Sequence, residues 1–291
     1  MKIGFVGLGR MGSNIVLNLL DHEHEVVGYD IDGNLVNKLS KKGMCPAKSY
    51  KELIDKLPSK KIIWLMVPSS IVGNCIKQLV PLLNKGDVII DGGNSYFKDS
   101  MRRSKLLAKR KIHFIDCGTS GGIKGARTGA CMMVGGNKRI YSKIRTIFED
   151  VCVKNGCGYV GSSGMGHFTK MVHNGIEYSF MGALSEGFNA LEKKKLDLKT
   201  ISKIYANGSI IESRLTSISH DIFKKNLLKK ISCRIPKGET EDEMENLEKI
   251  AYMPILHQAR ISRVETRNSK KCGKLISAMR NIFGGHKVIK K

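Results

Sequence analysis

Five polar residues recur at helical spacing in the second half of the 291-residue chain. Lys170 and Glu177 are seven positions apart, which places them nearly eclipsed on a helix, about 10 Å apart along its axis. His173 and Asn174 fall between them, and Tyr178 extends the stripe. A solvated helix face is the simpler interpretation. The apolar flanks favour burial instead, and a buried Lys and Glu are costly unless they line a site. A Lys whose pKa is lowered by burial can act as a general base.

A glycine-rich turn near the start of the chain could hold a dinucleotide. The turn consists of Gly7, Leu8, Gly9, Arg10, Met11 and Gly12. It follows a predicted strand and opens a predicted helix, which is the context that this motif requires. Gly7 would allow the tight turn, Gly9 would let a pyrophosphate approach the backbone, and Gly12 would let the helix pack closely. The N–H groups of the helix N-terminus would then face the phosphates.

The acid that such a motif requires is Asp30, 21 residues after Gly9. A carboxylate at the end of the second strand can accept hydrogen bonds from the adenosine ribose. It also repels a 2′-phosphate, and the next residues, Ile31 and Asp32, supply no Arg to bind one. The sequence therefore favours NAD, with NADP as the less favoured cofactor.

The elements that must position these residues alternate along the first part of the chain. Strands are predicted at 2–6, 25–29, 61–67, 87–90 and 112–115, and helices at 11–20, 33–41, 71–83 and 98–109. Such alternation predicts an α/β fold with a doubly wound parallel sheet of Rossmann type. The interpretation assigns residues 1–164 to an NAD-binding domain.

From residue 165 the pattern changes to helix. Apolar residues recur every three to four positions to about residue 196, which predicts one long helix. The remainder also has a helical pattern, with Pro236 and Pro254 as breaks. We expect residues 165–291 to form an all-helical domain for substrate binding and oligomerisation.

Composition narrows the class of protein. Hydrophobic residues make up 41% of the chain and charged residues 26%, as in globular proteins, and no apolar run is long enough for a membrane span. The N-terminus shows no signal-peptide pattern. The net charge of +24 would attract anions, but the Lys runs lack the interleaved aromatics of a nucleic-acid platform. The eight cysteines show no metal-like cluster, so we expect no metal, reduced thiols and a cytoplasmic location.

Several motifs together resemble a known family. They are FVGLGRMG at 5–12, MVP at 66–68, DGGNS at 91–95, GTSGG at 118–122, KMVHNGIEY at 170–178 and RNIFGGH at 280–286. The chain resembles the β-hydroxyacid dehydrogenase superfamily and, within it, the short NAD-preferring form of the decarboxylating 6-phosphogluconate dehydrogenases. The resemblance covers nearly the whole chain, and the motif from Lys170 to Tyr178 is its most specific part.

The resemblance implies a reaction. Lys170 would take the C3 hydroxyl proton of 6-phosphogluconate while a hydride passes to the nicotinamide. The β-keto acid would lose CO2, and Glu177 would protonate C1 of the enediol to give ribulose 5-phosphate.

The resemblance also implies binding residues. The cofactor would be held by the glycine-rich turn and Asp30 together with Val67, Pro68 and Asn94. The sugar acid would contact Asn94, Ser120, Gly121, Gly122, His173 and Asn174, and its phosphate end would contact Tyr178, Arg260, Arg280 and His286. Arg263 and Arg267 compete with Arg260 for this role. In the family the tail Arg and His come from a neighbouring subunit, which implies a homodimer or higher homo-oligomer.

The middle of the second domain departs from the family. The only Trp is Trp64, so the basic-Trp-Thr element expected near residues 237–243 is missing, and the segment 206–250 is divergent. Two alternatives follow. One is another β-hydroxyacid dehydrogenase acting on a small 3-hydroxy acid, which would not need His286 or several Arg. The other is a basic binding protein that has lost turnover.

Overall fold

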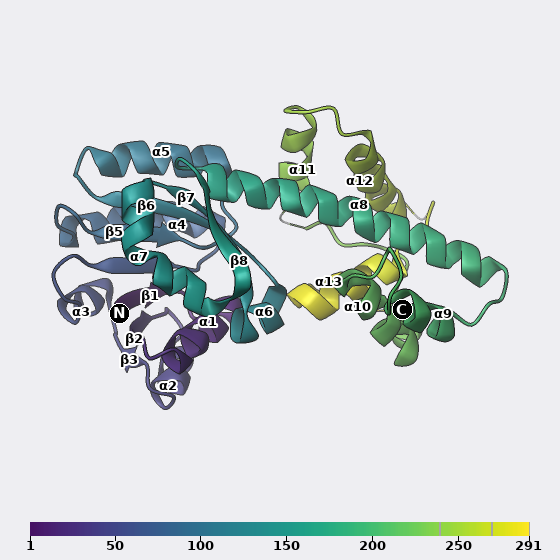
Figure 1. Cartoon of the computed structure of the whole chain (residues 1–291), viewed down its shortest axis with the longest axis horizontal. Helices are drawn as coiled ribbons and strands as arrows, with labels where there is room; N and C mark the ends of the chain where they lie inside the picture. Colours follow the sequence, from purple (N-terminus) through teal and green to yellow (C-terminus); the bar gives the residue numbers. More distant parts are fainter. Residues whose placement is uncertain (239, 269, 291) are drawn as a thin grey trace. The chain divides into compact units, whose positions relative to one another are not determined.

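A computed structural model describes residues 1–238, 240–268 and 270–290. The chain divides into two compact units, Met1–Lys170 and Met171–Lys291. The sequence places the domain boundary at 164/165, where helix α8 (Met165–Lys193) begins, and the division observed lies six residues later, inside that helix. Figure 1 shows α8 as one continuous helix.

The first unit is built on one eight-stranded sheet in the order β3-β2-β1-β4-β5-β6-β7-β8. Its strands are β1 (Lys2–Val6), β2 (Glu25–Tyr29), β3 (Cys45–Pro46), β4 (Ile62–Leu65), β5 (Val88–Asp91), β6 (His113–Ser120), β7 (Ala130–Gly136) and β8 (Cys152–Gly161). All neighbours pair in parallel except β6 and β7. The strand order reverses between β1 and β4, which is the place where doubly wound sheets bind ligands. The predicted Rossmann-type fold class is confirmed.

Helices cover the sheet of the first unit (Figure 1). They are α1 (Arg10–Asp21), α2 (Gly33–Ser40), α3 (Tyr50–Asp55), α4 (Ser69–Leu79), a 3₁₀ turn (Val80–Leu82), α5 (Phe97–Ala108), α6 (Gly122–Thr128) and α7 (Lys138–Val151). Neighbouring strand residues alternate between two apolar clusters: Trp64 belongs to one, and Ile63 and Leu65 to the other. A strand buried on both faces explains why these runs are continuously apolar.

The second unit is helical. After α8 come α9 (Leu198–Tyr205), α10 (Arg214–Lys224), a 3₁₀ turn (Leu227–Lys230), α11 (Glu241–Glu248), α12 (Pro254–Arg267) and α13 (Lys274–Gly284). Met181, Phe188, Ile222 and Met279 belong to its apolar core. At Gly175 an added Cβ would lie 3.0 Å from Leu247, so the missing side chain lets α8 and α11 pack closely.

The expectation of reduced cysteines is wrong at one place. Cys233 and Cys272 form a disulfide within the second unit. Spacing along the sequence did not indicate it, because the two residues are 39 positions apart and meet only in the folded chain. The other six cysteines of the described chain carry no disulfide. Among the described residues, we find no helix with both the length and the apolar character of a membrane span.

Candidate functional site

The glycine-rich turn connects β1 to α1. Gly7 has a φ of 94°, and a Cβ there would lie 2.4 Å from the Met66 carbonyl oxygen. A Cβ at Gly12 would lie 2.0 Å from the Gly7 carbonyl oxygen, whereas one at Gly9 would meet nothing within 4 Å. The turn is therefore closely packed at Gly7 and Gly12 and open above Gly9. This is the arrangement that lets a pyrophosphate approach the backbone at a helix N-terminus. Leu8 is buried within the turn, Arg10 is exposed and Met11 is half-buried.

Asp30 lies directly after β2, beside this turn. Its Oδ2 accepts a hydrogen bond from the Leu8 N–H at 2.5 Å, and its Oδ1 accepts one from the Asp32 N–H at 2.9 Å. These bonds fix the carboxylate next to the glycine-rich turn. The following residue, Ile31, is 94% exposed. The glycine-rich turn and the Asp30 carboxylate thus fit a dinucleotide whose ribose hydroxyls donate hydrogen bonds to a carboxylate.

The loops after β4 and β5 lie against each other at the same edge of the sheet. A Cβ at Gly93 would lie 2.8 Å from the Val67 carbonyl oxygen. Buried Asp91 accepts hydrogen bonds from Ser95 at 2.8 Å and from the Arg103 guanidinium at 3.2 Å, which anchors the loop. Of the predicted cofactor residues in these loops, Val67 and Asn94 are half-buried and Pro68 is exposed.

Lys170 lies on the first turns of α8, and β6 holds those turns. The two carboxylate oxygens of Asp116, which is fully buried in β6, accept hydrogen bonds from Gly164 N at 2.7 Å and His167 N at 3.0 Å. A Cβ at Gly118 would lie 2.4 Å from the Lys170 Cβ. The stem of Lys170 therefore packs directly on the backbone of β6. Sequence reasoning missed Asp116, whose role depends on a contact between residues far apart in the chain.

The register of the sheet relates Lys170 to the cofactor residues. Asp91 of β5 is paired with Asp116 of β6, so Gly118 lies level with the loop that follows β5. Ser120 ends β6, Gly121 precedes α6 with a φ of 110°, and Gly122 begins α6 with a φ of 63°. The structure thus brings Lys170, the 118–122 segment and the glycine-rich turn to the carboxyl edge of one sheet.

Farther along α8, three predicted residues lie together. The His173 Nδ1 is 3.9 Å from a Glu177 carboxylate oxygen and 3.3 Å from the Asn174 side-chain oxygen. The side chains of His173 and Glu177 are partly exposed, at 35% and 23%, while Asn174 is buried. The stripe is therefore half-buried, neither fully solvated nor enclosed.

The next residue of the stripe, Tyr178, lies in a cluster of cations. Its hydroxyl is 2.9 Å from the Thr240 hydroxyl, and the Arg263 guanidinium stacks on its ring at 3.2 Å from the centroid. Arg280 donates to the Pro236 carbonyl oxygen at 2.8 Å. We call Tyr178, Thr240, Arg263 and Arg280 the cation cluster. All four belong to the second unit.

Electrostatics indicate that the cation cluster suits an anion. Arg263 is 2% exposed, and its Nε and Nη2 have no hydrogen-bond partner among the described residues. Burial lowers the pKa of Arg263 to about 10, and the nearby charge of Arg280 makes a smaller contribution to this shift. Burial also lowers the pKa of Arg280. With a pKa of about 10, the Arg263 guanidinium remains charged at neutral pH, and a buried charge whose donors lack partners is stabilised by a bound anion such as phosphate.

The structure places Arg260 outside the cation cluster. Its guanidinium binds Glu248 at 2.8 Å and Glu245 at 2.8 Å, and Arg267 binds Glu241 at 3.1 Å. Arg263, the competing candidate, is the arginine of α12 that lies in the cation cluster. A helical-face argument could have found it, because the buried positions of α12 are Leu256, Ala259, Arg263 and Thr266, an i, i+3, i+4 stripe from which Arg260 deviates.

The two predicted residues near the C-terminus, Arg280 and His286, differ in burial. Arg280 is only 7% exposed, and it donates to Pro236 and lies beside Gly238 within its own chain. Arg280 is among the buried residues of α13, and its contribution to a neighbouring subunit stays a prediction. His286 lies beyond the end of α13, is exposed, and its carbonyl oxygen accepts from Asn281 at 2.8 Å.

Comparison with known proteins gives the family. Residues 2–162 match the family description "NAD binding domain of 6-phosphogluconate dehydrogenase", and residues 166–235 match "6-phosphogluconate dehydrogenase, C-terminal domain". This chain belongs to the 6-phosphogluconate dehydrogenase family. The second match ends before α11, α12 and α13, in line with the divergence seen in the sequence.

Relatives of this family cover the chain to different extents. An NAD(+)-dependent, decarboxylating 6-phosphogluconate dehydrogenase of Haloferax volcanii is 37% identical over 100% of this chain and 99% of its own length. The human decarboxylating enzyme is 39% identical over 79% of this chain but only 52% of its own length. Plasmodium falciparum 6-phosphogluconate dehydrogenase has a TM-score of 0.86 at 27% identity, covering 97% of this chain and 65% of that one. The chain thus spans about half to two thirds of the longer members.

Proposed function

We propose that the chain catalyses the oxidative decarboxylation of 6-phosphogluconate to ribulose 5-phosphate and CO2, with NAD as hydride acceptor. The observation that carries the proposal is the cation cluster, in which Arg263 and Arg280 are both buried and two donors of Arg263 have no partner among the described residues. A small unphosphorylated 3-hydroxy acid has one carboxylate and no second anionic group, so its dehydrogenase would not need a separate pair of buried arginines for a phosphate. The Haloferax volcanii relative, which is named for this reaction and for NAD, supports the assignment.

The glycine-rich turn and Asp30 would hold the cofactor. When bound, NAD supplies a nicotinamide ring that accepts a hydride. The N–H groups at the start of α1 would bind its pyrophosphate, and the Asp30 carboxylate would accept from the ribose hydroxyls. Because that carboxylate repels a 2′-phosphate and Ile31 and Asp32 offer no positive charge, the residues favour NAD over NADP.

Lys170 would act as the general base and Glu177 as the acid. Neutral Lys170 takes the C3 hydroxyl proton as the C3 hydrogen leaves with its electron pair, which gives a β-keto acid. Loss of CO2 then places that bond's electrons in an enediol, whose C3 oxygen receives the proton back from Lys170. Glu177 protonates the enediol carbon that becomes C1 of the product. Lys170 removes the proton from the same hydroxyl oxygen again, and the product is ribulose 5-phosphate.

The remaining predicted residues would bind the sugar acid. In the cation cluster, Arg263 and Arg280 would donate to the phosphate, since a guanidinium can meet two oxygens at once. Tyr178 would orient Arg263 through the stacked contact. The polar groups proposed along the sugar chain are those of Asn94, Ser120, Gly121, Gly122, His173 and Asn174.

The test is NADH formation with 6-phosphogluconate, with CO2 release measured alongside. We expect Lys170→Ala to lower kcat by roughly 10²–10⁴ while NAD binding is retained. Arg263→Met should mainly raise KM for 6-phosphogluconate, whereas Arg260→Met should leave it near the wild-type value, because Arg260 is bound to Glu248 and Glu245. Turnover of 3-hydroxyisobutyrate but not of 6-phosphogluconate would contradict the proposal.

We also propose that the enzyme is a homo-oligomer in the cytoplasm. Its substrate is a charged phosphate ester that does not cross a bilayer unaided. Arg280 already lies in its own chain's cluster, so the exposed His286 is the tail residue that a neighbouring subunit would receive. If so, refolding Lys170→Ala chains together with His286→Ala chains should restore activity in mixed dimers. Co-assembly without restored activity would show that His286 serves its own subunit.

A further inference from the structure

The disulfide joins the two segments that hold Arg280. Cys233 lies three residues before Pro236, whose carbonyl oxygen accepts from Arg280, and Cys272 lies two residues before α13, the helix that carries Arg280. The Gly273 N–H donates to the Cys233 carbonyl oxygen at 2.8 Å beside the bridge. The bridge therefore connects the acceptor of Arg280 to the start of the helix that presents it.

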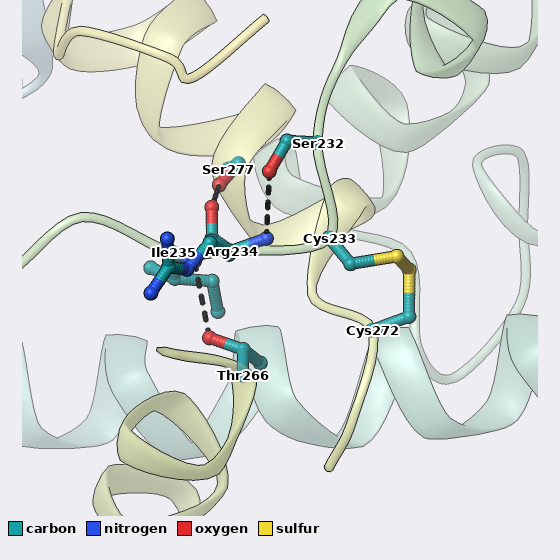
Figure 2. The surroundings of a disulfide bond; sticks show 7 residues. All are labelled: Ser232, Cys233, Arg234, Ile235, Thr266, Cys272 and Ser277. Atoms are coloured by element: carbon teal, nitrogen blue, oxygen red, sulfur yellow. Dashed lines mark hydrogen bonds between the residues drawn. A yellow bond between two sulfur atoms is a disulfide. The ribbon is translucent and has the colours of Figure 1, made fainter. Parts of the chain in front are cut away.

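The segment 233–238 belongs to no helix or strand, so individual contacts fix it (Figure 2). Ile235 N donates to the Thr266 hydroxyl at 3.0 Å, and the Arg234 carbonyl oxygen accepts from the Ser277 hydroxyl at 3.3 Å. Figure 2 shows the bridge as the covalent attachment of this segment, beside these side-chain hydrogen bonds. Segments held by a few such bonds open locally at low cost in free energy.

The same segment contacts the cation cluster at its other end. A Cβ at Gly238 would lie 2.6 Å from the Arg280 Nη2 and 3.8 Å from the Tyr178 hydroxyl oxygen. A shift of Pro236 or Gly238 would therefore move the Arg280 guanidinium directly. Because phosphate binding by Arg depends on the alignment of both N–H donors, such a shift would weaken it.

The bridge is open to attack by a reductant. Cys272 is exposed, Cys233 is half-buried, and Cys272 lies on a pocket of about 700 Å³ that is also lined by Lys229 and Lys274. The lining of that pocket contains four lysines and two carboxylates, Glu192 and Asp197, so its net charge is positive. Positive charge favours thiolates, which makes an exposed disulfide easier to exchange. The other cysteines of the described chain form no such pair.

We propose that the Cys233–Cys272 disulfide is a reversible redox switch that positions Arg280 for phosphate binding. A thiolate of an external dithiol attacks the Cys272 Sγ, the S–S bond breaks, and Cys233 leaves as a thiolate. The second thiol of the dithiol then displaces Cys272, so the reductant becomes a disulfide and the protein gains two electrons and two protons. The reduced enzyme binds the phosphate end of its substrate more weakly. This inference rests on the proposed function for its substrate, though not for its structural effect.

The first experiment compares oxidised enzyme with enzyme reduced by dithiothreitol, with the state of the bridge measured by alkylation and mass spectrometry. On reduction we expect KM for 6-phosphogluconate to rise about threefold or more, while KM for NAD and kcat stay near their oxidised values. Cys233→Ser/Cys272→Ser should show the raised KM without reductant and no response to it. Cys45→Ser, which removes an exposed cysteine outside the bridge, should respond like the wild type.

A second measurement does not depend on turnover. Reduction should speed hydrogen exchange at the Ile235 and Gly273 amides and raise the Kd for inorganic phosphate. If the oxidised enzyme does not turn over 6-phosphogluconate, the proposed function fails, and exchange and phosphate binding still decide the switch. Two outcomes would overturn the switch. One is that KM and Kd do not change although alkylation shows that the disulfide is reduced. The other is that both cysteines are alkylated in purified, air-oxidised protein, because the disulfide is then not formed.

Discussion

The position of Lys170 depends on Gly118 of β6, a residue without a side chain. With a Cβ at Gly118, the nearest atoms would be the Lys170 Cβ at 2.4 Å and the Gly166 carbonyl oxygen at 2.7 Å. Both are close to the backbone of α8 and cannot rotate away, so the helix would have to move. Asp116 opposes that movement, since it accepts hydrogen bonds from the first turns of α8.

We therefore expect Gly118→Ala to lower kcat by roughly 10², because a displacement of about 1 Å at a reacting group can cost that much. Affinity for NAD, measured by calorimetry, should change little, since the glycine-rich turn lies on another strand. The matched control is Gly158→Ala, where an added Cβ meets nothing within 4 Å. Equal activity of the two variants would show that Lys170 does not need this packing.

Asp30 gives a second prediction at the same scale. The wild type should prefer NAD over NADP by at least about tenfold in kcat/KM, equivalent to about 1.4 kcal/mol. Asp30→Ser with Ile31→Arg should shift the preference toward NADP, since it removes the repelling carboxylate and adds a cation at an exposed position. Asp32→Ser is the control, because Ser still caps α2 and leaves Asp30 in place. A wild type that prefers NADP would refute this assignment.

An ion pair between Glu248 and Arg260 connects helices α11 and α12. Glu248 accepts two hydrogen bonds from Arg260, at 2.8 and 3.1 Å, and Arg260 holds the pKa of that carboxyl below its ordinary value of 4.5. A carboxyl whose pKa is lowered by folding adds stability that is complete above its unfolded pKa. That stability is lost as the pH falls through the folded value.

Urea unfolding should therefore show a loss of stability of the second unit below about pH 4.5 that is smaller in Glu248→Gln. At neutral pH this variant should be about 1–2 kcal/mol less stable, in line with a hydrogen-bonded charged pair. Glu245→Gln is the matched control: its carboxylate is 52% exposed and touches Arg260 once, so its effect should be smaller. A larger effect of Glu245→Gln would mean that the Glu248 contact is not the stabilising one.

Local patterns predicted the elements that position the cofactor and failed where packing between distant segments decides. The strand at 25–29 and the continuous apolar run around Trp64 are evident in the sequence, because buried parallel strands are apolar on both faces. Sequence patterns do not predict β7, α7 and β8 within residues 130–161, because glycines and an antiparallel strand pair interrupt the alternation of strands and helices. The resemblance to the family favours Arg260 over Arg263, and it does not reveal that Arg263 is the one on the buried face of α12.

At the scale of the whole molecule, the bridge acts on one unit only. Both cysteines lie in Met171–Lys291, and the residues between them include α11 and α12. A crosslink over 39 positions limits the unfolded chain and should stabilise the second unit by roughly 3–4 kcal/mol in the chain-entropy treatment. The sheet of the first unit contains neither cysteine, so its stability should not depend on the bridge.

Reduction should therefore lower the melting temperature of the second unit by about 10 °C and leave the first unit unchanged. Native-state hydrogen exchange distinguishes the two, with amides of β4 reporting on the sheet and amides of α10 and α13 on the helical unit. Reduced wild type and Cys233→Ser/Cys272→Ser should agree, since each lacks the crosslink, while Cys45→Ser should match the oxidised wild type. Equal acceleration of exchange in β4 and α13 would show that the two units unfold as one, so that the bridge stabilises the whole chain. No acceleration in α13 would show that the hydrogen bonds of Ile235 and Arg234 hold the segment without it.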